Sequence, residues 1–461
     1  MSVLAAFAVP HPPIILPEIG RGEEQKIAGT TAAYREAMRQ AARLEPETVV
    51  LTSPHSALYA DYFHISPGRE AHGDFGSFGV RQVRVDAEYD TEFVEMLSRF
   101  CGEEKIPAGT FGEQNRSLDH ATMIPLHFLN ESAHGYRLVR IGLSGLSAGA
   151  HYRLGQCIAR AADALNRRVV FLASGDLSHK LKADGPYGFV PEGPEFDRAA
   201  TDALSRGDFR KLLSLDPDLC DAAAECGLRS FWIMAGALDR KAVESRLLSY
   251  EGPFGVGYGV ASFLVKGEDA SRDFGVQLEA EQKCRMRKRR EAEDLFVRLA
   301  RLSLETYVKT GTYARLPENL TPALTQIRAG AFVSLKKNGR LRGCIGTIEA
   351  VQENLALEIR KNAVSAGESD PRFPPVTEEE LPELVYSVDV LSDPEPIDSP
   401  DLLDVKKYGV VVENGNRRGL LLPDLAGVGS VEEQISIARK KAGIGRGEPI
   451  RLRRFRVVRH Q

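Results

Sequence analysis

Two histidines follow the same local pattern, in which an apolar segment and a proline come just before the imidazole. His11 follows the apolar residues 4–9, and His55 follows the apolar residues 48–52. Proline fixes its own φ and cannot continue a strand ladder, so each imidazole is held on a stiff turn at a strand end. Two imidazoles held in this way predict a shared metal ion or an acid/base pair.

Two further histidines occupy comparable positions. His179 follows the apolar residues 169–173 and a Gly-Asp turn in which Asp176 precedes it by three positions, and His120 follows Asp119 at the start of an apolar helical segment. A single histidine more often has a surface or structural role. Four of the ten histidines at strand-to-loop positions favour instead a cluster that binds a metal or transfers protons.

An oxygen-binding Fe(II) site with two histidines needs one carboxylate, which leaves three coordination positions open. Glu225 lies in an alanine-rich stretch ahead of a helical segment, where a buried carboxylate requires a cationic or metal partner. Glu251, at another strand end, and Cys226, a soft ligand, are the alternatives. Spacing alone does not choose among the three, and we take Glu225 as the expected third ligand.

Strand-like and helix-like segments alternate through the first 266 residues. This alternation predicts an α/β fold with a mixed sheet flanked by helices, and ligands then bind beyond the carboxyl ends of the strands. The predicted strands are 4–9, 48–52, 136–143, 168–173, 245–250 and 255–265. The predicted helices are 23–44, 91–101, 148–166, 195–215 and 228–238, and the stretch between residues 52 and 91 is less regular.

Composition narrows the class of protein. A net charge of -4 from 60 basic and 64 acidic residues argues against a nucleic-acid partner, and no apolar run reaches the roughly 18–20 residues of a membrane helix. The N-terminus has no basic region of the kind that precedes a secretory signal. Six scattered cysteines without a CxxC pair fit a reducing compartment, so we expect a cytoplasmic protein.

The length of 461 residues predicts two or three domains. A polar and charged stretch over residues 267–285 is the expected linker between a domain of residues 1–266 and a domain of residues 286–461. The mixed charges of residues 285–293 predict the start of an amphipathic helix that continues through Leu295 and Leu299.

The first domain resembles the class III extradiol ring-cleaving dioxygenases. The segments that carry the resemblance are His11-Pro12-Pro13, Ser53-Pro54-His55, Asp119-His120 and Ser174-Gly175-Asp176-Leu177-Ser178-His179. It implies a non-haem Fe(II) centre, or one with another divalent metal, that uses dioxygen to open a small aromatic diol. The roles that it implies are iron ligands for His11, His55 and Glu225, an acid/base role for His179, and pocket roles for His120 and for Asp176, which would orient His179.

The Memo family shares this fold and has a cysteine where the dioxygenases have glutamate. Glu225 lies next to Cys226, so both interpretations stay open. Glutamate as the third ligand favours oxygen chemistry, whereas cysteine favours a non-oxidative protein that binds a metal or acts as a scaffold.

The second half resembles the AMMECR family, which implies a smaller α+β domain. The segments that carry this resemblance are 341–347, 369–375, 386–391 and 419–423. Cys344 is either a thiolate nucleophile activated by Arg342 or a structural thiol. Arg372 and Asp370 either line a cleft with Cys344 or pair with each other.

Memo-like and AMMECR-like proteins occur together with a radical SAM protein, in the AmmeMemoRadiSam system. The resemblance therefore implies a radical SAM partner for this fusion of two modules. An oligomer is compatible with the sequence.

Overall fold

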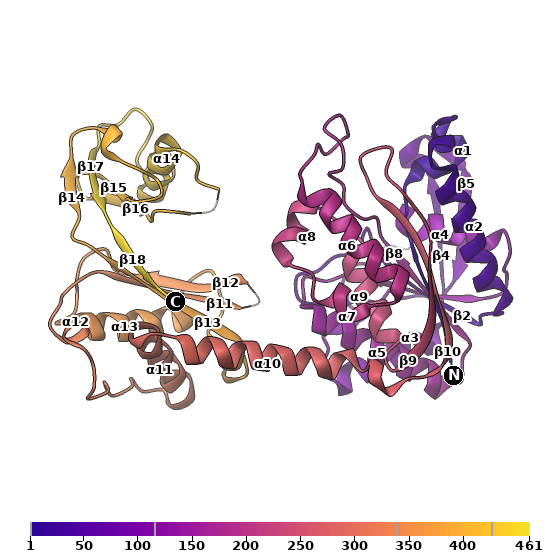
Figure 1. Cartoon of the computed structure of the whole chain (residues 1–461), viewed down its shortest axis with the longest axis horizontal. Helices are drawn as coiled ribbons and strands as arrows, with labels where there is room; N and C mark the ends of the chain where they lie inside the picture. Colours follow the sequence, from indigo (N-terminus) through magenta and orange to yellow (C-terminus); the bar gives the residue numbers. More distant parts are fainter. Residues whose placement is uncertain (1, 115–116, 338, 426) are drawn as a thin grey trace. The chain divides into compact units, whose positions relative to one another are not determined.

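The computed structural model describes residues 2–114, 117–337, 339–425 and 427–461, and it divides into two compact units, Met1–Glu281 and Gln282–Gln461 (Figure 1). The predicted fold class is confirmed, because a mixed sheet flanked by helices forms the first unit and smaller sheets with helices form the second. In the described part of the chain, no helix combines the length and the apolar character that a membrane crossing requires.

Unit 1 is built on a six-stranded sheet with the strand order β7-β2-β8-β1-β10-β9. Four neighbouring strands are parallel, namely β1 (Val3–Val9), β2 (Thr48–Ser53), β7 (Arg137–Gly142) and β8 (Val169–Ser174). The antiparallel pair β9 (Lys241–Glu251) and β10 (Tyr258–Glu268) completes one edge. Each of these six strands lies within a few residues of a predicted one, because a strand that is buried on both faces is apolar almost throughout.

Helices cover both faces of the sheet, so a hydrophobic core lies on each side of it. The side chains of β1 contribute to both cores. Ala6 and Ala8 point into one core, whereas Phe7 and Val9 point into the other, as strand alternation requires. The first core is covered by α3 (Thr91–Glu103), α5 (Ala148–Leu165), α6 (Glu192–Arg206), α7 (Phe209–Leu213) and α9 (Leu228–Ala237). The second is covered by α2 (Ala28–Arg43) and α4 (His120–Asn130).

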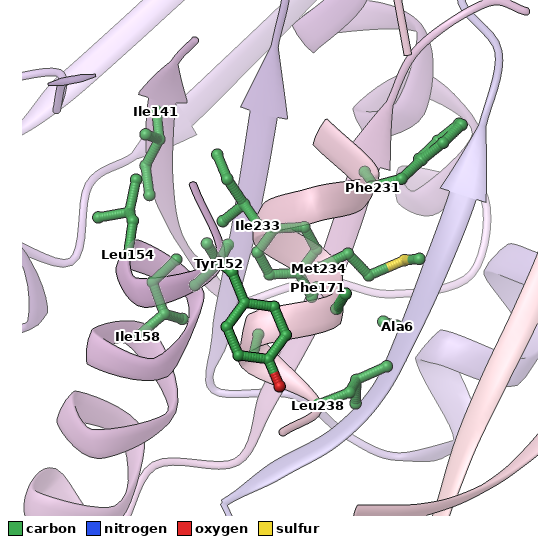
Figure 2. Close-up of a cluster of buried hydrophobic side chains, with 14 of the residues drawn as sticks. Ala6, Ile141, Tyr152, Leu154, Ile158, Phe171, Phe231, Ile233, Met234 and Leu238 are labelled. Carbon is green, nitrogen blue, oxygen red and sulfur yellow. The ribbon is translucent and has the colours of Figure 1, made fainter. Parts of the chain in front are cut away.

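Figure 2 shows part of the first core, where Tyr152 and Ile158 of α5 lie close to Ile233 and Met234 of α9. The two helices pack at a very short distance, because each has a glycine at the crossing. A Cβ atom at Gly155 would lie 2.1 Å from the carbonyl oxygen of Ile233.

Some elements differ from the predictions. The helix predicted over residues 195–215 is two helices, because Gly207 has a φ of 63° and Asp208 caps α7. The less regular stretch contains β3 (Phe63–His64), the hairpin of β4 (Glu70–Phe75) and β5 (Val80–Glu88), and the short helix η3 (Gly76–Phe78). The remaining short elements of unit 1 are η1 (Pro13–Ile15), α1 (Pro17–Gly20), η2 (Glu23–Ile27), β6 (Ala108–Gly109), α8 (Pro217–Ala223) and η4 (Ala270–Arg272).

The segment predicted as the linker contains η4 and the first part of α10 (Phe274–Ala292), which spans the division between the units. The charged residues 285–293 end this helix and do not open the next one. α11 (Leu295–Thr310) begins separately, because the Asp294 carboxylate accepts hydrogen bonds from the backbone N–H groups of Phe296 and Val297.

Unit 2 has two four-stranded antiparallel sheets with the orders β12-β11-β13-β18 and β14-β17-β15-β16. The strands are β11 (Ala331–Lys337), β12 (Arg340–Gly346), β13 (Leu384–Leu391), β14 (Glu395–Ile397), β15 (Gly409–Asn414), β16 (Arg417–Leu421), β17 (Arg451–Phe455) and β18 (Val457–His460). The helices are α11, α12 (Pro322–Thr325), α13 (Leu355–Glu368), η5 (Glu378–Glu383), η6 (Pro400–Leu402) and α14 (Val431–Ala442). α11 and α13 pack on the first sheet, and α14 packs on the second.

Replacing Gly155 with alanine should destabilise unit 1 by about 1–3 kcal/mol, because the added methyl group forces α5 and α9 apart. The single tryptophan of the chain, Trp232, lies in α9, so its fluorescence follows urea unfolding of this unit. Gly102→Ala is the matched control. Gly102 lies in α3 with open space around it, and alanine there should raise stability by up to about 1 kcal/mol. Equal midpoints for the two variants would contradict this packing argument.

Candidate metal centre

Three histidines meet beyond the carboxyl ends of the parallel strands. His11 follows β1, His55 follows β2, and His120 is the first residue of α4. Each offers one ring nitrogen, and the three nitrogens lie within 4.8 Å of one another, a grouping that can hold a metal ion. The ring centroids are 5.0 Å apart for His11 and His55 and 4.3 Å apart for His55 and His120.

A serine at the end of β8 sets the tautomer of His11. The Ser174 hydroxyl donates its hydrogen to the carbonyl oxygen of Ala121 at 2.7 Å, and it lies 3.0 Å from His11 Nδ1. Because its one hydrogen is already used, the hydroxyl accepts a hydrogen bond from Nδ1–H. His11 Nε2 therefore keeps its lone pair for the group of three nitrogens, as ligating imidazoles require.

A second serine connects His55 to His120. Ser53, the last residue of β2, donates a hydrogen bond of 2.6 Å to the Asp119 carboxylate and accepts one from the backbone N–H of His55. Asp119 also caps α4 by accepting a hydrogen bond from the backbone N–H of Thr122. One carboxylate therefore joins the end of the strand to the start of the helix.

Burial keeps the imidazoles neutral. It lowers the pKa of His11 well below the ordinary histidine value, and the positive forms of His55, His120 and His179 lower it further. Burial lowers the pKa of His120 to about 4 and also lowers the pKa of His55, while the nearby Asp119 carboxylate opposes both shifts. Several neutral imidazoles close together are a donor set for a cation.

His179 lies near the group of three without belonging to it. It influences the pKa of His11, and burial lowers its own pKa. Its Nδ1–H donates to the carbonyl oxygen of Leu177 at 3.1 Å, and a backbone contact with Ala224 also favours the protonated ring. Its loop is anchored by the buried Asp197, which accepts hydrogen bonds from the backbone N–H of Ser178 at 2.7 Å and from the Tyr250 hydroxyl at 2.6 Å.

Glu225, the expected third ligand, has another position. Its Oε2 accepts a hydrogen bond of 2.6 Å from the backbone N–H of Leu228, at the start of α9, and burial raises its pKa to about 7. A carboxylate just before a helix is favoured there by the free N–H groups and the helix dipole. Among the residues that the structure describes, the group of three contains no carboxylate. The role of Glu225 as an iron ligand stays a prediction.

The two alternative third ligands, Glu251 and Cys226, lie in different places. Glu251 accepts two hydrogen bonds of 2.6 Å from Thr30 at the start of α2, so it serves that helix. Cys226 lies at the site, with Sγ 3.7 Å from His11 Nε2, and accepts a hydrogen bond from the backbone N–H of Asp176. Burial raises the pKa of the Cys226 thiol.

Asp176 contacts His11, whereas the prediction placed it against His179. Its Oδ1 accepts a hydrogen bond of 2.8 Å from the backbone N–H of His11, and its Oδ2 lies 3.8 Å from Nε2 of the same residue. The carbonyl of Leu177 takes the position at His179 that was expected for Asp176. Asp176 follows β8, and His11 follows the neighbouring strand β1. The short aspartate side chain therefore reaches His11 more easily than it reaches His179, which lies three positions further along the chain.

In unit 2, the residues predicted around Cys344 bind mainly its backbone. Asp370 accepts a hydrogen bond of 2.8 Å from the N–H of Cys344, and Arg372 donates one of 3.2 Å to its carbonyl oxygen. Arg372 also pairs with Asp370 and holds the pKa of that carboxyl well below its usual range. Arg342, the predicted activator of the thiol, instead binds Glu380 with two hydrogen bonds.

These contacts protect an edge strand. β12 is the outer strand of its sheet, and Asp370 and Arg372 bind the outward N–H and C=O groups of Cys344 as a further strand would. The Cys344 thiol accepts a hydrogen bond of 3.1 Å from the Ser334 hydroxyl. β11 and β12 pair with each other as antiparallel neighbours, and Asn338 between them lies outside the described residues.

Sequence reasoning overlooked the residues that position the histidines, namely Ser174, Ser53 and Asp197. Ser53 and Ser174 each end a strand and begin one of the predicted site segments, so their position was a usable signal for the role that was missed. Asp197 lies within a helix of ordinary amphipathic pattern, and nothing in that pattern indicates its contact with the loop of His179.

Known proteins match both units. The family model described as the catalytic LigB subunit of aromatic ring-opening dioxygenase matches residues 5–261, and the AMMECR1 model matches residues 297–460. A protein of Clostridium acetobutylicum is 40% identical over 469 residues, which cover all of both chains. A protein of Thermotoga maritima is 50% identical over 37% of this chain and 98% of its own length. The crystal structure of an uncharacterized Pyrococcus horikoshii protein is 34% identical over 37% of this chain and 90% of its own, with a TM-score of 0.34.

The chain therefore belongs to the LigB family, with an N-terminal LigB domain fused to a C-terminal AMMECR domain. This confirms the resemblances that the two sets of motifs indicated. LigB proteins depend on a metal, which agrees with the three grouped histidines.

Ser174→Ala should weaken the binding of a divalent metal about 10- to 100-fold, because His11 loses the acceptor that orients its ring. Titration of the purified protein with Zn²⁺ against a competing chelator measures this. Ser230→Ala is the control, since its hydroxyl donates to the backbone carbonyl of Ser174 and is likewise buried. Equal affinities for the two variants would contradict the assignment of the tautomer.

Metal affinity should stay nearly constant from pH 8 down through pH 6.5 and fall only at lower pH. Protons compete with the metal only below the pKa of each imidazole, and burial lowers the pKa of all three, that of His120 to about 4. Ordinary imidazoles would lose metal from about pH 6.5 downward. Calorimetric titration with Zn²⁺ at several pH values distinguishes the two cases, and a decline that begins at or above pH 6.5 would rule out the neutral cluster.

Proposed function

We propose that unit 1 is a metal-dependent dioxygenase that opens an aromatic diol, with Fe(II) as its metal. The observation that carries the proposal is the group of three ring nitrogens from His11, His55 and His120 beside a fourth imidazole, His179, that stands outside it. Imidazole is a suitable ligand for iron and other first-row metals. Membership of the LigB family supports the same reaction class.

His179 is the proton carrier in this proposal. A bound divalent cation supplies Lewis acidity, which lowers the pKa of a coordinated diol hydroxyl. His179 has Nδ1–H fixed on the carbonyl of Leu177, so Nε2 accepts a substrate proton and later returns it. Its lowered pKa keeps the imidazole neutral near pH 7, in the form that a base requires.

A second candidate is a non-oxidative, Memo-like metal-binding protein that acts with a radical SAM partner. The observation that favours it is the Cys226 thiol, 3.7 Å from His11 Nε2, together with a described histidine group that has no carboxylate. A thiolate added to imidazoles favours softer metals and suits binding without oxygen chemistry.

Anaerobic loading with Fe(II), followed by oxygen uptake against a panel of catechols, separates the two functions. The dioxygenase consumes oxygen with at least one diol, and Cys226→Ser keeps both iron and uptake. Stoichiometric iron without uptake for any diol, or loss of the metal in Cys226→Ser, would favour the second candidate.

His179→Gln should keep iron and diol binding and lower turnover by about 10²–10⁴-fold, the usual contribution of general acid/base catalysis. His55→Ala should lose the metal, because it removes one of the three grouped nitrogens. Iron content and turnover are measured on both variants. If His179→Gln loses iron as completely as His55→Ala, His179 is a ligand and its role as a base is wrong.

A further inference from the structure

Two exposed aromatic side chains contact the pocket histidines. The Phe78 ring packs edge-to-face on His120 with a centroid distance of 5.4 Å, and the Tyr187 ring packs in the same way on His179 at 5.2 Å. Phe78 is 37% exposed and Tyr187 is 59% exposed. Both rings therefore leave apolar surface exposed directly beside the histidines.

Phe78 is held in place by its own turn. The Asp74 carboxylate accepts a hydrogen bond from the N–H of Gly76, and the N–H of Gly79 bonds to the carbonyl of Gly76, which closes η3. Gly79 has a φ of 81°, which suits glycine at this position. The Phe78 ring also packs against the fully buried Phe75 ring, with a centroid distance of 6.3 Å. These contacts fix the direction of an otherwise exposed ring.

Tyr187 lies in a closed loop. Leu181 and Phe189 form an antiparallel bridge at its base, and the N–H of Leu181 bonds to the carbonyl of Gly255. Gly185 packs so closely on Gly255 that a Cβ atom would lie 3.2 Å from the Gly255 Cα. The loop is therefore tied at its base and along one side.

We propose that Phe78 and Tyr187 are the specificity residues of the metal pocket, and that they select a flat aromatic ring over an aliphatic ligand with the same donor atoms. The inference rests on the proposed function and deepens it. Each ring touches a histidine by edge-to-face contact and stays partly exposed, so apolar surface is left for a substrate ring. Aromatic pairs gain energy beyond the area that they bury, which an aliphatic chelator cannot use.

The test measures ligand binding under anaerobic conditions with the Fe(II)-loaded full-length protein. The probes are catechol and acetohydroxamate, which both bind through two oxygens but differ in aromatic character. In Phe78→Leu and in Tyr187→Leu, catechol affinity should fall about 3- to 10-fold, while acetohydroxamate affinity stays unchanged. Tyr187→Phe keeps the ring and should keep catechol affinity.

Phe111→Leu is the matched control, because Phe111 is 84% exposed and has no ring contact with a histidine among the described residues. Iron content is measured for each variant. If wild-type protein binds acetohydroxamate but no catechol, the proposed function fails and this inference fails with it. If wild-type protein binds catechol and the leucine variants bind it equally well, the proposed function stands and only this inference is overturned. Loss of both ligands in a leucine variant also overturns it, because the ring would then support the histidine.

Discussion

The hydrogen bond from the Ser53 hydroxyl to the Asp119 carboxylate joins the end of β2 to the start of α4, and two of the three grouped histidines depend on it. His55 lies two residues beyond Ser53, and His120 comes directly after Asp119. The Asp119 carboxylate also caps α4. The same group therefore stabilises the start of the helix and holds His120 in position.

A second constraint is electrostatic. Imidazoles with centroids 4.3–5.5 Å apart repel one another strongly when charged, and burial adds a penalty for each charge. The fold therefore stabilises the neutral forms, and Ser174 fixes which nitrogen of His11 faces the group. Three neutral ring nitrogens within 4.8 Å of one another form a position that a cation fills favourably. The same neutrality lets His179 accept a proton.

The sequence was sufficient for the sheet of unit 1, because strands buried on both faces are apolar along their length. It was also sufficient for the convergence of His11, His55 and His120, since each comes after a strand end or a helix cap. The position of Glu225 could not be predicted from the sequence. A carboxylate before a helix fits a metal site and a helix start equally well, and only the fold shows the contact with Leu228.

The hairpin of β4 and β5 was missed for a different reason. Its strands face solvent on one side, so their composition is mixed and their alternation is interrupted by a bulge between Asp74 and Phe75. Phe78 lies in the short helix that connects them. The sequence pattern therefore could not predict that this hairpin contributes Phe78 to the site.

The two units show that a motif can identify a fold without identifying a chemistry. In unit 1, the motif residues bring ring nitrogens together and leave them available. In unit 2, Asp370 and Arg372 bind each other and the backbone of Cys344, so their main polar groups are already used to close a sheet edge. Gly343 has a similar explanation, because a Cβ atom there would lie 2.1 Å from the carbonyl oxygen of Ala366 in α13. Packing and edge protection therefore account for the contacts that Asp370, Arg372 and Gly343 make in the unit 2 motif.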